Sequence, residues 1–291
     1  MKTATVPNAK LAHLREILRK LDSVVVAYSG GVDSTFLMWV AADELGNGAL
    51  AVTARSETYP KHEAEEALSM ARGFGFRHRV VQTSELAIPG FRYNPPERCY
   101  YCKSELFATL RMIADEEGIR YVADGSTVSD ITDYRPGRKA AEEKDVLSPL
   151  IQADLNKEEV RTLSKELGVP TWNKPAFACL ASRFPYHEEI TEEKLSRVAL
   201  AEEYLRSLGI RQYRVRHHGP LARIEVEHKD IEILLKREDL IGRFRKLGFT
   251  YVTVDLEGYR PGSMNDTLTV QSTNGRHHPS VPVNDEPVNE R

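Results

Sequence analysis

Short apolar runs alternate with longer segments along the first 170 residues. Residues 23–29 form a continuous apolar run, which suits a strand that is buried on both faces of a parallel sheet. The longer segments, such as residues 61–75, have a helical pattern and several end at a glycine. We expect strands at residues 23–29, 49–55, 77–83 and 120–125, and helices at residues 32–46, 61–75, 103–118 and 156–168. This alternation predicts an α/β fold with a doubly wound parallel sheet, whose ligand site lies at the carboxyl ends of the strands.

The pattern changes after about residue 188. A helix at residues 193–209 precedes two alternating strands, and a helical region then leads to a last strand at residues 249–256. This order predicts a smaller α+β domain. The chain ends in a polar, proline-rich segment that is typical of disorder. We therefore expect an α/β domain at residues 1–188, an α+β domain at residues 189–268 and a disordered tail at residues 269–291.

Composition narrows the partners and the compartment. The 291 residues include 40 basic and 43 acidic side chains, which give a formal net charge of −3. The chain therefore lacks the surplus of positive charge that would favour a nucleic-acid partner. No apolar run approaches the length of a membrane span. The first 20 residues read as a polar lead into an amphipathic helix and lack the apolar centre of a signal peptide. These features predict a cytoplasmic protein without a nucleic-acid or membrane partner.

The segment SGGVDS stands between the first expected strand and the first helix that follows it. Gly30 and Gly31 let the backbone turn tightly and approach a ligand closely. Successive N–H groups at a helix N-terminus bind anions, and the hydroxyls of Ser29 and Ser34 can add donors. Asp33 can hold Mg²⁺ against the phosphates, although it would also serve as an ordinary helix cap. The segment lacks the lysine of a Walker A loop, but its full pattern predicts a phosphate site.

The three cysteines of the chain could meet at one edge of the sheet. Cys99 and Cys102 form a C-x-x-C pair directly ahead of the helix expected at residues 103–118, and Cys179 lies in an irregular segment after the last helix of the α/β domain. Because their number is odd and no secretory signal precedes them, metal binding or catalysis is favoured over disulfides. Three thiolates can bind a [4Fe–4S] cluster and leave one iron open to an external sulfide.

Three alternative roles for the cysteines stay open. The C-x-x-C pair could be a redox dithiol, in which the helix N-terminus favours Cys102 as the thiolate. A zinc site would need a fourth ligand, for which His187 is a candidate. The thiols could also be buried and unconnected.

Charged residues alternate on the two strands of the α+β domain. Arg214 and Arg216 share one face of the first strand, and Arg223, Glu225 and Glu227 share one face of the second. The forked donors of arginine suit phosphate oxygens, so this face could bind the phosphate of a substrate. A solvated, salt-bridged face would have the same pattern.

The segment SGGVDS resembles the signature of the PP-loop ATP pyrophosphatases, and residues 148–183 resemble their later P-L…K-x-E-V-R-x-L…L-G-x-P…K-P segment. The resemblance implies that residues 1–188 are a PP-loop domain, in which ATP is split between its α- and β-phosphates. An adenylated substrate is then attacked by a nitrogen or sulfur nucleophile. The resemblance also places Ala54 and Gly125, which follow expected strands, beside ATP.

Further motifs resemble the LarE sulfur transferases over nearly the whole chain except both termini. They are SGGVDS, DYRPGRKA (133–140), NKPAFACLASRFPY (173–186), AEEYLRSLG (201–209), RVRHH, ARIEVE and GYRPGSMNDTL (258–268). The resemblance implies an ATP-dependent enzyme that adenylates a carboxylate of pyridinium-3,5-biscarboxylic acid mononucleotide and then inserts sulfur. Pyrophosphate and AMP are released, and the thiocarboxylate serves the synthesis of the nickel-pincer nucleotide, the cofactor of lactate racemase.

LarE proteins differ in their source of sulfur. Some sacrifice the sulfur of one cysteine, which matches Cys179, whereas others carry three cysteines and are thought to hold a [4Fe–4S] cluster. Because Cys99 and Cys102 are both present, the chain resembles the second kind, with all three cysteines as metal ligands. The resemblance also implies ATP and Mg²⁺ as cofactors, a homo-oligomer and an unknown donor of sulfide.

The resemblance adds candidate site residues in the α+β domain and around Cys179. Glu202 and Glu225 become candidates for the active site beside Cys179 and Asp33. The candidates for the substrate phosphate are Arg183, Arg214 and Arg216, with Arg135 and Arg138 as further loop arginines.

Other activities of this superfamily are rival hypotheses. A PP-loop tRNA thiolase would usually carry an RNA-binding module, and none is recognisable. An ammonia-using ligase would not need three cysteines, and the intact SGGVDS argues against a nucleotide-binding protein without catalysis.

Overall fold

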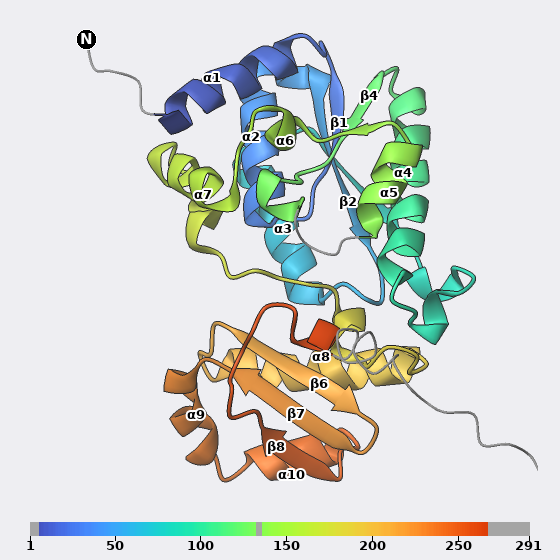
Figure 1. Cartoon of the computed structure of the whole chain (residues 1–291), viewed down its shortest axis with the longest axis vertical. Helices are drawn as coiled ribbons and strands as arrows, with labels where there is room; N and C mark the ends of the chain where they lie inside the picture. Colours follow the sequence, from blue (N-terminus) through green and yellow to red (C-terminus); the bar gives the residue numbers. More distant parts are fainter. Residues whose placement is uncertain (1–5, 132–135, 267–291) are drawn as a thin grey trace, which may run out of the picture. The chain divides into compact units, whose positions relative to one another are not determined.

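The computed structural model describes residues 6–131 and 136–266 (Figure 1). Within these residues the helices are α1 (Val6–Arg19), α2 (Val32–Leu45), α3 (Lys61–Gly73), α4 (Arg98–Glu116), α5 (Gly137–Glu143), α6 (Pro149–Gln152), α7 (Lys157–Glu166), α8 (Glu192–Ser207), α9 (His228–Leu235) and α10 (Leu240–Lys246). The strands are β1 (Val24–Ala27), β2 (Ala49–Arg55), β3 (His78–Gln82), β4 (Tyr121–Ala123), β5 (Val146–Leu147), β6 (Tyr213–His218), β7 (Leu221–Val226) and β8 (Tyr251–Val254). The tail expected at residues 269–291, residues 267–268 of the last motif and Arg135 lie outside the described residues.

Five parallel strands form the larger sheet, in the order β3-β2-β1-β4-β5. Val24 and Val26 of β1 pack in one apolar cluster with residues of α1, α2, α3 and α7, whereas Val25 packs in a second cluster with residues of α4 and α5. The helices therefore cover both faces of the sheet (Figure 1). This arrangement confirms the predicted doubly wound α/β fold, and it explains why the first strand is apolar at successive positions.

The start of α4 differs from the expectation. The helix begins at Arg98 and not at residue 103, so Cys99 and Cys102 lie within its first turns, and the prediction that they precede it is wrong. The guanidinium of Arg98 is buried and donates to the side chain of Asn94 and, over 2.7 Å, to the carbonyl of Ala181. This contact between distant segments fixes the first turn of α4, and no pattern in the neighbouring sequence predicts it.

The smaller sheet has the order β6-β7-β8, with β6 and β7 antiparallel and β7 and β8 parallel. Its strands pack with α8 and α10 around residues such as Val215, Ile224 and Phe244. The α-β-β-α-β order is the one predicted, except that the helical region is split into α9 and α10.

The chain divides into a compact unit up to Tyr259 and a second unit from Arg260 onward. The described part of the second unit contains a short 3₁₀ helix, Ser263–Asn265, and an ion pair of 3.0 Å between Arg260 and Asp266. The domain boundary expected at residues 188 and 189 stays a prediction. No helix in the described ranges is long and apolar enough to cross a membrane.

Candidate active site

The SGGVDS loop joins β1 to α2, and its first glycine is required by the fold. Gly30 has a φ of 68°, and a Cβ atom there would lie 2.6 Å from the Cβ atom of Ala67 on α3. A side chain is therefore excluded both by the backbone conformation and by the neighbouring helix. Gly31 has a φ of −75°, which any residue adopts, so the turn itself needs only the first glycine.

The two serines of the loop face each other across its opening. The hydroxyl oxygens of Ser29 and Ser34 lie 3.1 Å apart, and the amide of Ser29 donates to the hydroxyl of Ser34 over 3.2 Å. A Cβ atom at Gly125 would lie 2.9 Å from the amide nitrogen of Ser34, so the segment after β4 packs directly on the loop. Asp33 lies in the first turn of α2. These residues, all predicted to bind ATP, thus come together at the carboxyl ends of β1 and β4.

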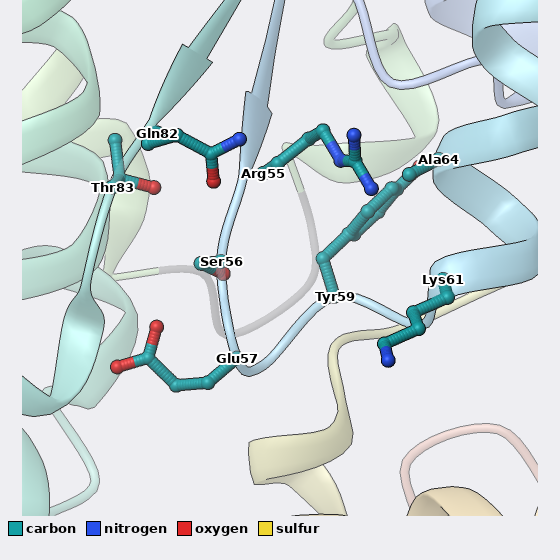
Figure 2. Close-up of a pocket in the computed structure, with 8 residues that line it drawn as sticks. All are labelled: Arg55, Ser56, Glu57, Tyr59, Lys61, Ala64, Gln82 and Thr83. Carbon is teal, nitrogen blue, oxygen red and sulfur yellow. The ribbon is translucent and has the colours of Figure 1, made fainter.

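A cavity of about 310 Å³ adjoins the loop at the ends of β2 and β3 (Figure 2). Its lining consists of Arg55, Ser56, Glu57, Tyr59, Lys61, Ala64, Gln82 and Thr83. The predicted residue Ala54 lies in β2, directly before the first of these residues. The hydroxyl of Tyr59 donates to the carbonyl of Ser29 over 2.5 Å, so one wall of the cavity is tied to the loop. The cavity therefore offers polar side chains beside the predicted phosphate site.

Cys102 and Cys179 pack against the same apolar cluster, although they come from two distant segments. Cys179 directly precedes a 3₁₀ helix, Leu180–Arg183, and the amide of Leu180 donates to the carbonyl of Thr58 over 2.9 Å. Charge on Cys179 or Cys99 would raise the pKa of Cys102, so the thiols are within electrostatic reach of one another. Cys99 is exposed and the other two are half-buried.

Burial raises the pKa of two of the thiols. It raises the pKa of Cys102 to about 12, with smaller contributions from Cys179 and from Glu85, whose carboxylate accepts a hydrogen bond of 4.0 Å from this thiol. Burial also raises the pKa of Cys179, although the positive charges of Arg98 and Arg183 oppose it. The dithiol hypothesis expected Cys102 to be the thiolate, and this expectation is wrong because desolvation outweighs the helix N-terminus.

The sequence suggested two kinds of metal centre for the cysteines. Among the described residues, no group of three or more His, Cys, Asp or Glu side chains is placed to hold a single metal ion, so the zinc hypothesis gains no support. A [4Fe–4S] cluster distributes its thiolates over separate irons, so its cysteines need not converge on one point. The cysteines supply the ligand type that such a cluster takes, and the cluster stays a prediction.

Thiol reactivity in the metal-free protein should follow these environments. At pH 8 we expect iodoacetamide to modify Cys99 about a hundredfold faster than Cys102, because the alkylating species is the thiolate and burial shifts its formation in Cys102 to high pH. Raising the pH toward 12 should reduce the difference between the two modification rates. Peptide mass spectrometry over time measures both rates, and unfolding in urea, the control, should make them similar. Equal rates in the folded protein would contradict the described environment of Cys102.

Arg183 and Glu202 form a buried ion pair that holds the Cys179 segment on α8. Their side chains are 0% and 3% exposed, and two parallel hydrogen bonds of 2.8 and 2.9 Å join them. The remaining terminal nitrogen of Arg183 donates to the carbonyls of Ala178 and Cys179 over 2.7 and 3.1 Å. Glu202 also accepts the amide of Val215 on β6 over 2.9 Å. The pair therefore fixes the backbone at Cys179, and a contact of Arg183 with a substrate phosphate stays a prediction.

The two arginines of β6 also reach the segment around Cys179. Arg216 pairs with the buried Glu225 over 2.7 Å and donates to the carbonyl of Ser182 over 2.9 Å. Arg214 donates to the carbonyl of Ala176 over 2.8 Å and lies over the ring of Tyr259. Burial, aided by the charge of Arg183, lowers the pKa of Arg214 to about 10, so it remains a cation at neutral pH. The strand pattern predicted a shared face but not these contacts with backbone carbonyls.

Sequence reasoning missed a lysine at the phosphate loop. The ammonium of Lys174 lies 2.7 Å from a carboxylate oxygen of Glu63, 2.9 Å from one of Glu66 and 3.4 Å from the carbonyl of Gly30. Lys174 belongs to the K-P motif, which in the sequence is only a mark of family resemblance. The motif could have pointed to this lysine, but Lys174 and Gly30 are 144 residues apart, so the sequence does not show that they are in contact.

Comparisons with known proteins agree with this geometry. The chain is 48% identical to the uncharacterized protein slr1717 of Synechocystis sp. over 264 residues, which cover 90% of the chain and 98% of that protein. It is 42% identical to the pyridinium-3,5-bisthiocarboxylic acid mononucleotide synthase of Lactiplantibacillus plantarum over 262 residues, 89% of the chain and 95% of the synthase. A probable tRNA sulfurtransferase of Methanothermobacter thermautotrophicus is 29% identical over 162 residues, 50% of the chain and 40% of that protein. No protein-family model matches the chain.

The parallel sheet, with SGGVDS between β1 and α2, defines an enzyme of the PP-loop class. The identity to the synthase extends over nearly the full length of both proteins. The chain therefore belongs to the LarE family of ATP-dependent PP-loop sulfurtransferases.

Proposed function

We propose that the protein adenylates a carboxylate of pyridinium-3,5-biscarboxylic acid mononucleotide and replaces one of its oxygens by sulfur, for nickel-pincer nucleotide synthesis. The similar synthase is named for the corresponding bisthiocarboxylic acid product. The observation that carries the proposal is the link between the cysteines and the phosphate loop. Leu180, next to Cys179, is hydrogen-bonded to Thr58, and the neighbouring Tyr59 is hydrogen-bonded to Ser29.

The reaction needs two displacements. In the first, a carboxylate oxygen of the substrate attacks the α-phosphorus of ATP, and pyrophosphate leaves as the new P–O bond forms. In the second, sulfide attacks the acyl carbon, a C–S bond forms, and AMP leaves with the electron pair of the broken C–O bond. The loop amides with Ser29 and Ser34 would bind the phosphates, and Asp33 would hold Mg²⁺, which would neutralise part of their negative charge.

Arg214 is the arginine we assign to the substrate phosphate. Its terminal nitrogens donate to the carbonyls of Tyr213 and Ala176, and a phosphate could replace these contacts. All three nitrogens of Arg183 are engaged with the buried Glu202 and with the Cys179 segment. Arg216, with Glu225, would hold the segment from the side of β6. Glu202 and Glu225 therefore act in this proposal by positioning arginines next to the reacting groups.

Cys99, Cys102 and Cys179 would hold a [4Fe–4S] cluster. When bound, such a cluster supplies an open iron that can carry an external sulfide. The protein would contribute three thiolates. Because Cys99 is exposed, the cluster site would be open to solvent at that cysteine. A homo-oligomer and the identity of the sulfide donor stay predictions.

Anaerobic purification with iron and sulfide analysis tests the cluster. We expect about four irons per chain, and their loss when Cys99, Cys102 or Cys179 is replaced by serine. The control is Ser207→Ala on the exposed side of α8, which should keep the iron. Stoichiometric zinc in place of iron would contradict the cluster, and loss of sulfur from Cys179 after one turnover would instead indicate the sacrificial route.

A further inference from the structure

The phosphate loop carries no lysine of its own, yet the fold brings one to it. Lys174 lies in the same irregular segment as Cys179, and its ammonium lies 3.4 Å from the carbonyl of Gly30. In Walker A loops a lysine within the motif reaches the β- and γ-phosphates. Here a lysine from a distant segment lies beside the phosphate loop.

The ammonium is held by two carboxylates of α3 that differ in exposure. Glu63 is 12% exposed and lies 2.7 Å away, whereas Glu66 is 53% exposed and lies 2.9 Å away. Burial lowers the pKa of Lys174, but the two carboxylates outweigh it and raise the pKa overall, so the side chain is a cation. The pair with Glu66 is weak, because solvent screens it, and a bound anion of higher charge can displace it.

The lysine stem also connects the nucleotide site with the sulfur site. Lys174 and Cys179 are five residues apart along the segment. The lysine side chain has a flexible four-carbon stem, so its ammonium can move from one anion to another without unfolding the segment.

We propose that Lys174 binds the phosphates of ATP beyond the α-phosphate, exchanging Glu66 for the nucleotide. The same contact would stabilise the negative charge of the departing pyrophosphate. The inference rests on the proposed function, which supplies the nucleoside triphosphate, and it adds a phosphate-binding residue to that function.

Isothermal titration of the full chain with MgATP and with AMP tests the proposal. We expect Lys174→Met to weaken MgATP binding by about 10- to 100-fold, the range of one charge-assisted hydrogen bond, and to change AMP binding by less than about twofold. Lys174→Arg should restore most of the affinity for MgATP. Glu66→Gln should tighten MgATP binding by about twofold to fivefold, because it removes the competing carboxylate.

A matched control is Lys165→Met, since Lys165 lies over the ring of Trp172 and not at the loop. This variant should bind MgATP as the unaltered chain does. Equal weakening of ATP and AMP in Lys174→Met, or no weakening of either, would overturn the inference. If Lys174→Met does not fold, the Glu66→Gln variant provides the test. Unchanged or weaker MgATP binding in Glu66→Gln would overturn the inference. If the unaltered chain binds no MgATP, the proposed function itself fails.

Discussion

Replacement of Arg183 by methionine should lower the free energy of unfolding by about 3–5 kcal/mol, the usual cost of breaking a buried ion pair. The variant leaves the carboxylate of Glu202 buried with only the amide of Val215 as a described partner. It also removes the guanidinium nitrogen that donates to the carbonyls of Ala178 and Cys179. Urea denaturation followed by circular dichroism measures the loss.

The double variant Arg183→Met, Glu202→Leu separates charge from packing. Removing both charges should recover most of the stability, because an apolar pair of similar volume avoids the desolvation cost. Sulfur transfer should nevertheless stay low, since Arg183 would no longer hold the carbonyls of Ala178 and Cys179. Arg237→Met, on an exposed segment between α9 and α10, is the control and should change stability by less than about 0.5 kcal/mol. A single variant as stable as the unaltered chain would contradict the importance of the pair.

Replacement of Cys179 by alanine should abolish formation of the thiocarboxylate while leaving adenylation in place. Cys179 lies outside the phosphate loop, and the loop contacts of Ser29, Ser34 and Gly125 do not involve it. We therefore expect ATP–pyrophosphate exchange to continue at a similar rate, with the substrate carboxylate present. Chromatography of the nucleotide product and radiolabelled exchange measure the two steps separately.

Cys99→Ala distinguishes the two sources of sulfur. If a cluster carries the sulfide, this variant should lose sulfur transfer as completely as Cys179→Ala, because three thiolates are needed to leave one open iron. If Cys179 gives up its own sulfur, Cys99→Ala should still make one product per chain. Loss of pyrophosphate exchange in either variant would show that the cysteines are needed for the ATP site instead.

The sequence pattern predicted those helices and strands that depend on residues close together in the chain. The strand expected at residues 49–55 matches β2, because a continuous apolar run between helices has few other structures open to it. β5 was missed because it has two residues and owes its pairing to β4. The start of α4 was missed because the contact of Arg98 with Ala181 joins segments 83 residues apart.

The same division applies to the site. The loop residues were predicted because SGGVDS is a contiguous motif with a physical reason for each position. The position of Arg183 beside Cys179 suggested a phosphate ligand, but its partner Glu202 lies on another helix, and only the fold reveals that the pair is buried. The approach of Lys174 to Gly30 likewise depends on the packing of α3 against the loop.

The most direct test of the proposed activity is the mass of the nucleotide product. Reconstituted protein would be incubated anaerobically with pyridinium-3,5-biscarboxylic acid mononucleotide, ATP, Mg²⁺ and sulfide, and the products separated by chromatography and weighed by mass spectrometry. We expect a product in which one carboxylate oxygen is replaced by sulfur, with one AMP and one pyrophosphate released for each replacement, and more than one product per chain. An unchanged nucleotide, or AMP release without sulfur in the product, would contradict the proposed activity.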